Sequence, residues 1–176
     1  MDQKLVCPSN GRSGGLVLFW NNNVNVHRLA LDPMFIDVTI EENNNSVWCL
    51  TGMYGDFRWE NKHLTWSRMR RLHQAHNLPW LLVGDLNEIM YLHEKEGGNQ
   101  RPPQYMQAFH EVVEDCELHD LGYLGDPYTW RRGRIRERLD RGLVNDLWSA
   151  RFPHAALQNL EFNNSDHRPL LVDTEY

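Results

Sequence analysis

The chain has 176 residues, enough for one domain with a substantial core and too few for two comfortable ones. Apolar residues make up 41% of it, with seven Trp, six Tyr and six Phe, which excludes a disordered tail. The formal net charge of −6 argues against a protein that grips nucleic acid by bulk positive charge, so such a role needs a local basic patch or a bound cation.

Cysteine usage and the N-terminus bear on where the protein works. Cys7, Cys49 and Cys116 are scattered and odd in number, which argues against a disulfide framework or a cysteine-based zinc site and fits a reducing compartment. Met1–Asn10 lacks the apolar run of a signal peptide, and the longest apolar stretches are too short to cross a membrane. We therefore expect an intracellular protein, nuclear or cytoplasmic, without a membrane partner.

The first third of the chain is predicted to be rich in strands. Four apolar runs have strand length: Gly15–Trp20, Val24–Ala30, Phe35–Ile40 and Val47–Tyr54. Asn21–Asn23 has the composition of a hairpin turn between the first two strands, and Asn43–Asn45 turns the chain between the last two. The third run alternates, with Ile36 on one face and Asp37 on the other.

Two helices are predicted, Glu60–His76 and Pro103–Leu118, with Met69 and Phe109 on their inner faces. Between them, Trp80–Val83 is continuously apolar, the pattern of a strand buried on both faces. Further strands are predicted at Tyr128–Arg131, Arg138–Val144, Ala155–Phe162 and Pro169–Asp173. Strands outnumber helices, so we predict an α/β or α+β architecture of two packed sheets flanked by helices, within one domain spanning 1–176.

An acid and an amide follow the buried strand. Asp85 and Asn87 are two residues apart, so on an extended chain both project to one face, and Gly84 lets another group approach the backbone. A carboxylate and an amide at a strand's carboxyl end suit a hard cation and a phosphate oxygen. The same residues also make good turn chemistry, so a plain turn is an equally open interpretation.

Two further segments carry titratable groups. Asp166 and His167 precede the last strand, where a capping loop is the simpler interpretation. Asp140 lies inside an alternating strand, predicted to face the same way as Arg138 and opposite to Arg141. A buried aspartate needs a partner, and a histidine is the obvious one, because the pair fixes the imidazole tautomer and raises its basicity.

Basic residues and histidines give two weaker signals. Six arginines lie within Trp130–Arg141, and four of them are candidates for contact with a nucleic-acid backbone; a solvated hairpin explains them equally well. The four are Arg131, Arg132, Arg134 and Arg136. His73 and His76 are three apart on a helix and could bind a metal, although an amphipathic helix accounts for them.

Taken in order, these motifs resemble the endonuclease/exonuclease/phosphatase superfamily, the DNase I-like enzymes. The residues that carry the likeness are 84–87 (Gly-Asp-Leu-Asn), 138–140 (Arg-Leu-Asp) and 165–167 (Ser-Asp-His). Further segments resemble the endonuclease domains of plant-type LINE, or non-LTR, retroelements: 11–16, 54–55, 125–130, 137–141, Trp148 and 152–153. The resemblance runs from about Gly11 to Val172.

The resemblance implies a Mg²⁺- or Mn²⁺-dependent phosphodiesterase and a role for each matching residue. Asp85 would bind the attacking water or the metal-bound phosphate, and Asn87 and Tyr54 would contact the phosphate. Asp166 would ligate the metal, directly or through water. His167 would polarise the phosphate or transfer a proton, oriented by Asp140.

The sequence departs from the family pattern near its beginning. The family's principal metal ligand is a Glu on an earlier strand, whereas Val6–Gly15 already resembles the part beyond that Glu. We therefore expect a domain missing its first strands, with weak or absent metal binding, and with self-association or a protein partner covering the exposed sheet.

Three functions are compatible with this pattern. The first is a weakened nuclease or phosphodiesterase acting on nucleic acid. The alternative is a catalytically inactive retroelement-derived remnant that binds or regulates. A phosphatase of small phosphoesters is the third and least favoured option.

Overall fold

The computed structural model describes residues 3–9, 15–42 and 45–176. Most of the 11–16 motif and part of the Asn43–Asn45 turn lie outside the described residues. The strands of the main sheet are β3 (Asn25–Asp32), β4 (Phe35–Glu41), β5 (Val47–Tyr54), β6 (Trp80–Asp85), β12 (Asp140–Val144) and β8 (His119–Asp120). The remaining strands are β1 (Gln3–Cys7), β2 (Leu16–Trp20), β7 (Lys95–Glu96), β9 (Leu124–Gly125), β10 (Trp130–Arg132), β11 (Ile135–Glu137), β13 (Ala156–Asn159) and β14 (Leu170–Asp173).

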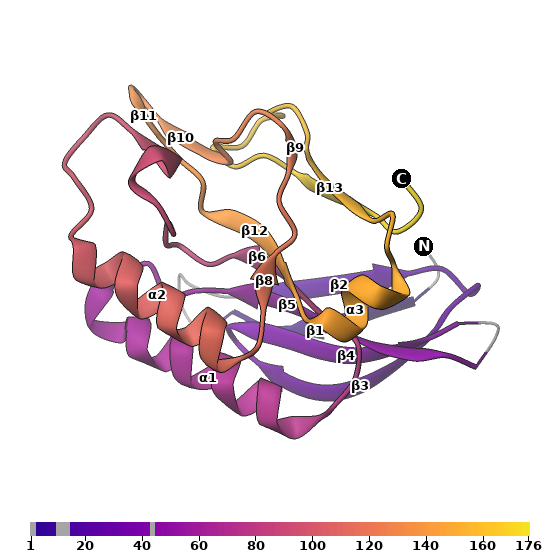
Figure 1. Ribbon diagram of the computed structural model, residues 1–176. Helices are drawn as coiled ribbons and strands as arrows, with labels where there is room; N and C mark the ends of the chain where they lie inside the picture. Colours follow the sequence, from indigo (N-terminus) through magenta and orange to yellow (C-terminus); the bar gives the residue numbers. More distant parts are fainter. Residues whose placement is uncertain (1–2, 10–14, 43–44) are drawn as a thin grey trace.

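A six-stranded sheet in the order β3-β4-β5-β6-β12-β8 forms the centre of the molecule (Figure 1). Its neighbours pair antiparallel except β5 and β6, which run parallel and are joined through a helix. Trp80, Leu81 and Leu82 of β6 are almost fully buried, which confirms the prediction of a strand covered on both faces.

Two helices, α1 (Lys62–Ala75) and α2 (Pro103–Asp115), lie side by side over one face of this sheet (Figure 1). Their apolar stripes confirm the two predicted helices, and a short 3₁₀ turn, Trp59–Asn61, leads into the first. Met69 and Phe109 are fully buried and join the larger core cluster against the sheet. This layer fixes the orientation of β5, β6 and β12.

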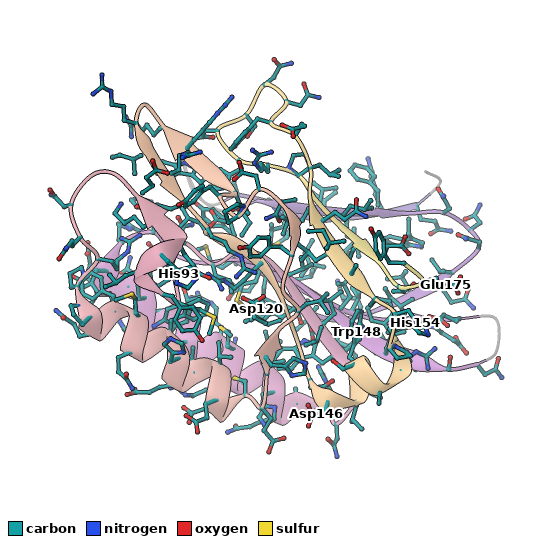
Figure 2. The ribbon with its side chains drawn as sticks, turned by 45° about the horizontal axis from the view of Figure 1, so that its top comes forward. His93, Asp120, Asp146, Trp148, His154 and Glu175 are labelled. Carbon is teal, nitrogen blue, oxygen red and sulfur yellow. The ribbon has the colours of Figure 1, made fainter. Side chains whose placement is uncertain are left out.

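The opposite face of the sheet is covered by shorter elements. The β1–β2 pair packs Leu5 and Leu18 against Ile36 and Val38 of β4. The three-stranded sheet β14-β13-β9 contributes Val172 to a second cluster with α3 (Asp146–Arg151), a helix that was not predicted from the sequence. Figure 2 shows its two sides: Trp148 points inward, while Asp146 points outward.

The hairpin predicted around Asn21–Asn23 is wrong. A turn does occur after Trp20, but β2 pairs with β1 and β3 pairs with β4, so the two strands enter different sheets. The polar-looking segment Gln3–Cys7 supplies the partner that β2 needs, with Leu5 opposite Leu18. In the described part of the chain, no helix is long and apolar enough to span a membrane.

Candidate active site

Three neighbouring strands bring polar side chains into one row. β5 and β6 run parallel, so their carboxyl ends coincide, and Tyr54 is paired with Asp85 in register. β12 runs the other way, so its first residue, Asp140, is paired with Asp85 from the other side. The sheet register therefore places a phenol and two carboxylates side by side at one end of the main sheet.

His167 reaches this row from the loop before β14. Its Nδ1 lies 2.9 Å from Asp140 Oδ2, and its Nε2 lies 3.9 Å from Asp85 Oδ2. The loop is held in place by a β-bridge between His167 and Trp130 and by a hydrogen bond from the His167 amide to Ser165 Oγ. The predicted Asp–His pair is therefore present, with the second imidazole nitrogen aimed at the other carboxylate.

The Asp85–Asn87 segment forms a tight turn that also presents its polar groups. Asn87 adopts a positive φ of 54°, and both its backbone N–H and its side-chain amide donate to the Asp85 carboxylate at 2.8 Å. The Asn87 amide also donates to the Gly55 carbonyl at 2.9 Å. Gly84 has a φ of 147°, and a Cβ there would lie 2.1 Å from the Met53 carbonyl, so the predicted close approach of backbone is confirmed.

Burial of Asp85 and Tyr54 and the neighbouring carboxylates raise the pKa values at this site. Burial, followed by the neighbouring Asp140 carboxylate, raises the pKa of Asp85 to about 7. Burial lowers the pKa of His167, but the hydrogen bond and charge of Asp140 outweigh it, so the pKa of His167 is raised. Burial and the charge of Asp85 raise the pKa of Tyr54, which keeps its hydroxyl protonated as a donor.

The ligand atoms of Asp85, Asp140 and His167 all lie within 4.8 Å of one another, so this group could hold a cation. Asp166 lies beside it rather than within it. Its side chain is exposed and accepts from Trp130 Nε1 at 3.1 Å, and its carbonyl accepts from the Arg131 amide. Its assignment as a metal ligand stays a prediction.

The β10–β11 hairpin extends from the loop that carries Asp166 and His167. Its arginines at 131, 132, 134 and 136 are all exposed, while Tyr128 and Phe162 carry the guanidinium groups of Arg136 and Arg131 over their rings. Arg131 lines an open cavity with Phe162, Asn164 and Asp166. Because Trp130 and Arg131 also contact Asp166 and His167, the hairpin and the row of acids form one continuous surface.

Arg138 and Arg141 do not belong to that surface. Both are buried and share two acids, Glu94 and Asp120, at distances of 2.7–3.2 Å. Their predicted placement on opposite faces is wrong, because β11 ends at Glu137 and β12 begins at Asp140, so strand alternation does not extend through Arg138. We refer to these four residues as the arginine–acid network.

Two supporting residues were not identified from the sequence. The first is Lys62, which is 2% exposed and donates to the carbonyls of Leu86 and Asn87 at 3.1 and 2.6 Å, anchoring the turn after Asp85. Burial lowers the pKa of Lys62 to about 8. Its spacing of four and seven residues from Trp66 and Met69 was the available signal, since it places Lys62 on the inner face of α1.

The second such residue is Thr129, which is fully buried. Its hydroxyl oxygen accepts from the backbone N–H groups of Leu139 and Asp140, both at 2.9 Å. It therefore fixes the start of β12 and the carboxylate that orients His167. Thr129 lies within the 125–130 motif, which was the available signal, but the motif by itself indicated no role for its hydroxyl.

No family model matches the sequence, and no curated protein matches it. Solved structures do share its fold. The endonuclease domain of TRAS1, a telomere-specific non-LTR retrotransposon, has a TM-score of 0.75 at 13% identity, covering 97% of this chain and 79% of that one. The human Nocturnin catalytic domain with bound sulfate anion has a TM-score of 0.55 at 15% identity, covering 97% and 72%.

A third structure, an endonuclease/exonuclease/phosphatase family protein from Bacteroides thetaiotaomicron, has a TM-score of 0.50 at 17% identity, covering 78% of this chain and 52% of that one. These likenesses confirm the predicted fold class, a DNase I-like α/β sandwich.

Proposed function

We propose that the protein is a divalent-metal-dependent phosphodiesterase that cleaves nucleic acid. One observation carries the proposal: the Asp140–His167 hydrogen bond of 2.9 Å aims the imidazole at Asp85, on a fold shared with a retrotransposon endonuclease domain. A positioned imidazole beside a carboxylate of raised pKa is the arrangement that acid–base catalysis requires.

The donor atoms of this site fit Mg²⁺ or Mn²⁺. Asp85 and Asp140 carry like charges side by side, and a bound cation would relieve the repulsion between them. Carboxylate oxygens from Asp85, with Asp166 beside it, would hold the ion, which when bound neutralises phosphate charge and acidifies a bound water. The family resemblance implies a Glu as the principal metal ligand, and within the described residues this ligand group contains no glutamate. We therefore propose that the metal is bound weakly.

The protein's own groups divide the remaining work. Asp85 accepts the proton of the attacking water. His167 is held protonated by Asp140 and donates from Nε2 to an oxygen of the scissile phosphate. Tyr54 supplies a further donor to the phosphate. Asn87 keeps the Asp85 carboxylate oriented through two hydrogen bonds, and its side-chain amide uses its second N–H on the Gly55 carbonyl.

The substrate class follows from the exposed arginines next to the site. The β10–β11 hairpin offers guanidinium groups and aromatic rings on the surface that continues from His167, which suits a polynucleotide backbone. A small phosphoester would not reach them. We propose further that the chain is a retroelement-type endonuclease; the TRAS1 likeness supports this, and the plant-type LINE likeness rests on the sequence motifs alone.

Nicking of supercoiled plasmid tests the proposal. We expect cleavage in Mg²⁺ or Mn²⁺ that a chelator abolishes, and a rate loss of about 10²–10⁴-fold in His167→Ala and in Asp85→Ala. His154→Ala is the matched control, because His154 is exposed and lies beside Glu175 at another part of the surface (Figure 2).

Two results would contradict catalysis. Cleavage that survives both active-site substitutions would come from a contaminant. The second result is a chain that binds DNA without cleaving it. If Arg132→Ala and Arg134→Ala then each reduce the slope of log affinity against log salt concentration by about one, the protein is the binding remnant instead.

A further inference from the structure

A second group of potential metal ligands lies away from the candidate active site. Asp37 of β4, Cys49 of β5 and His76 at the end of α1 each offer one ligand atom, and these atoms all lie within 4.8 Å of one another. In the sequence, scattered cysteines argued against a cysteine-based zinc site, and His76 was paired with His73. The fold instead brings one residue from each of three separate elements together, where no spacing rule could find them.

The Asp37 carboxylate is buried without a compensating charge. Asp37 is 1% exposed, and its Oδ1 accepts from Thr51 Oγ1 at 2.6 Å and from Cys49 Sγ at 3.3 Å, both neutral donors. None of the ion pairs found in the described part of the chain includes Asp37. Burying an ionised carboxylate is costly unless a positive charge accompanies it, and a bound cation would supply that charge here.

His76 provides the second, independent sign. Its Nε2 is buried and has no hydrogen-bond partner within the described structure. The imidazole packs edge-on against Trp80, with ring centroids 5.7 Å apart, which fixes its orientation. A neutral imidazole offers a lone pair on this nitrogen to a cation.

We propose that Asp37, Cys49 and His76 form a site for Zn²⁺ or a similar thiophilic divalent cation, separate from the catalytic metal. Tetrahedral Zn²⁺ takes sulfur, nitrogen and oxygen ligands at about 2.0–2.3 Å, and the 3.3 Å separation of Cys49 Sγ and Asp37 Oδ1 suits one edge of that tetrahedron. Water completes the fourth position.

Charge balance favours a divalent ion. On binding, the Cys49 S–H bond breaks, its proton leaves to solvent, and the sulfur electron pair forms the bond to the metal. The thiolate, the Asp37 carboxylate and a dication then sum to zero, which removes the unpaired buried charge. Because one proton leaves for each ion bound, apparent affinity should rise with pH.

The position of His76 bears on how an ion would reach the site and on which elements it would connect. His76 and Trp80 line a cavity of about 660 Å³, together with His73, His119 and Asp146. The cavity leads from the surface to the one ligand on a helix end, while the other two are in adjacent strands of the main sheet. An ion bound there ties the end of α1 to β4 and β5.

Cobalt binding tests the proposal, because Co²⁺ reports sulfur ligation by its absorption. In the folded, chelator-stripped chain, a sulfur-to-cobalt charge-transfer band and the d–d bands of tetrahedral coordination should grow and saturate at one equivalent of Co²⁺. Cys49→Ser should lose the band, and His76→Gln should weaken binding at least about tenfold. Zn²⁺ should displace the cobalt and raise the melting temperature of the wild type.

Two control variants distinguish this site from metal binding elsewhere on the chain. Cys116→Ser is matched, because Cys116 is also fully buried in the same core cluster and belongs to no ligand group found in the described residues. Asp85→Ala should keep the band, since the catalytic site contains no sulfur. If Cys49→Ser does not fold, His76→Gln decides the outcome. A folded wild type without the band, or a band that survives in Cys49→Ser or is lost in Cys116→Ser, overturns the proposal.

Discussion

β12 separates two charged clusters that are built in opposite ways. In the arginine–acid network, Arg138 and Arg141 face Glu94 and Asp120, so two cations meet two anions. At the candidate active site, Asp85 and Asp140 face each other with one imidazole between them. The first cluster balances its charges and the second does not.

The proton affinities follow this difference. Burial would raise the pKa of Glu94 and of Asp120, but the arginines overcome it, and both pKa values are lowered. Burial and a like charge together raise the pKa of Asp85. Neighbouring residues of β12 thus belong to two different clusters. The arginine–acid network stabilises the fold, whereas the candidate active site keeps a repulsion that a bound ligand would relieve. Function is expected at the second cluster.

The largest effect on stability should come from breaking the balanced cluster. Arg141 is fully buried, and Arg141→Ala leaves Glu94 and Asp120 with a single cation. We expect a loss of about 3–5 kcal/mol in the free energy of unfolding, because an uncompensated buried charge remains. Urea denaturation followed by tryptophan fluorescence measures it. A loss below about 1 kcal/mol would mean that the network does not depend on this balance.

Removing a charge from the unbalanced cluster should have the opposite sign. Asp85→Asn eliminates the repulsion with Asp140, and at pH 8 without metal we expect an increase on the order of 1–2 kcal/mol in the free energy of unfolding. The lost carboxylate hydrogen bonds to Asn87 offset part of the gain. The same substitution should abolish cleavage.

Measuring the stability of wild type and Asp85→Asn as a function of pH provides the control for this prediction. The folded pKa of Asp85, about 7, exceeds its ordinary value of 3.8, so its contribution to stability is complete at low pH and is lost as pH rises through 7. The advantage of Asp85→Asn should therefore vanish only below the ordinary value of 3.8, where the carboxyl is protonated in both states, and should shrink when Mg²⁺ is added. Glu94 and Asp120 have lowered pKa values, so their contribution is present at neutral pH and is lost under acid conditions. A pH-independent difference between wild type and Asp85→Asn would contradict the repulsion.

The smallest effect on the free energy of unfolding should come from an exposed arginine–carboxylate pair. Arg136 and Glu96 form an ion pair with side chains 44% and 54% exposed. Arg136→Ala should cost less than about 1 kcal/mol, because water screens the charges and both side chains keep their freedom when unpaired. Measured beside Arg141→Ala in the same urea series, it tests burial directly; equal losses in the two variants would remove burial as the cause of the difference.

The sequence predicted the elements better than their pairing. Long, strongly periodic segments such as Lys62–Ala75 and Val47–Tyr54 were found because local residue patterns determine them. The hairpin at Asn21–Asn23 was predicted wrongly, because the pairing of β2 depends on a partner in another part of the chain. Register and sheet order are properties of distant contacts, which a local pattern does not contain.

The site was predicted in the same partial way. Asp85, Asp140 and His167 were identified from motifs, and the structure brings them together. The support from Lys62 and Thr129 was missed, because each acts through backbone groups of residues far away in sequence. The roles assigned to Asn87, Tyr54 and Asp166 stay predictions for the cleavage assay.

The function of β12 depends on its register to within a single residue. Asp140 faces Asp85, while the next residue, Arg141, points to α2 and lies 5.3 Å from the Phe109 ring centroid. A one-residue shift in the register of β12 against β6 would exchange the two faces. A guanidinium would then enter the acid row and a carboxylate would enter the core. Length variation among relatives should therefore be absent between residues 138 and 144 and gather in the β10–β11 turn instead.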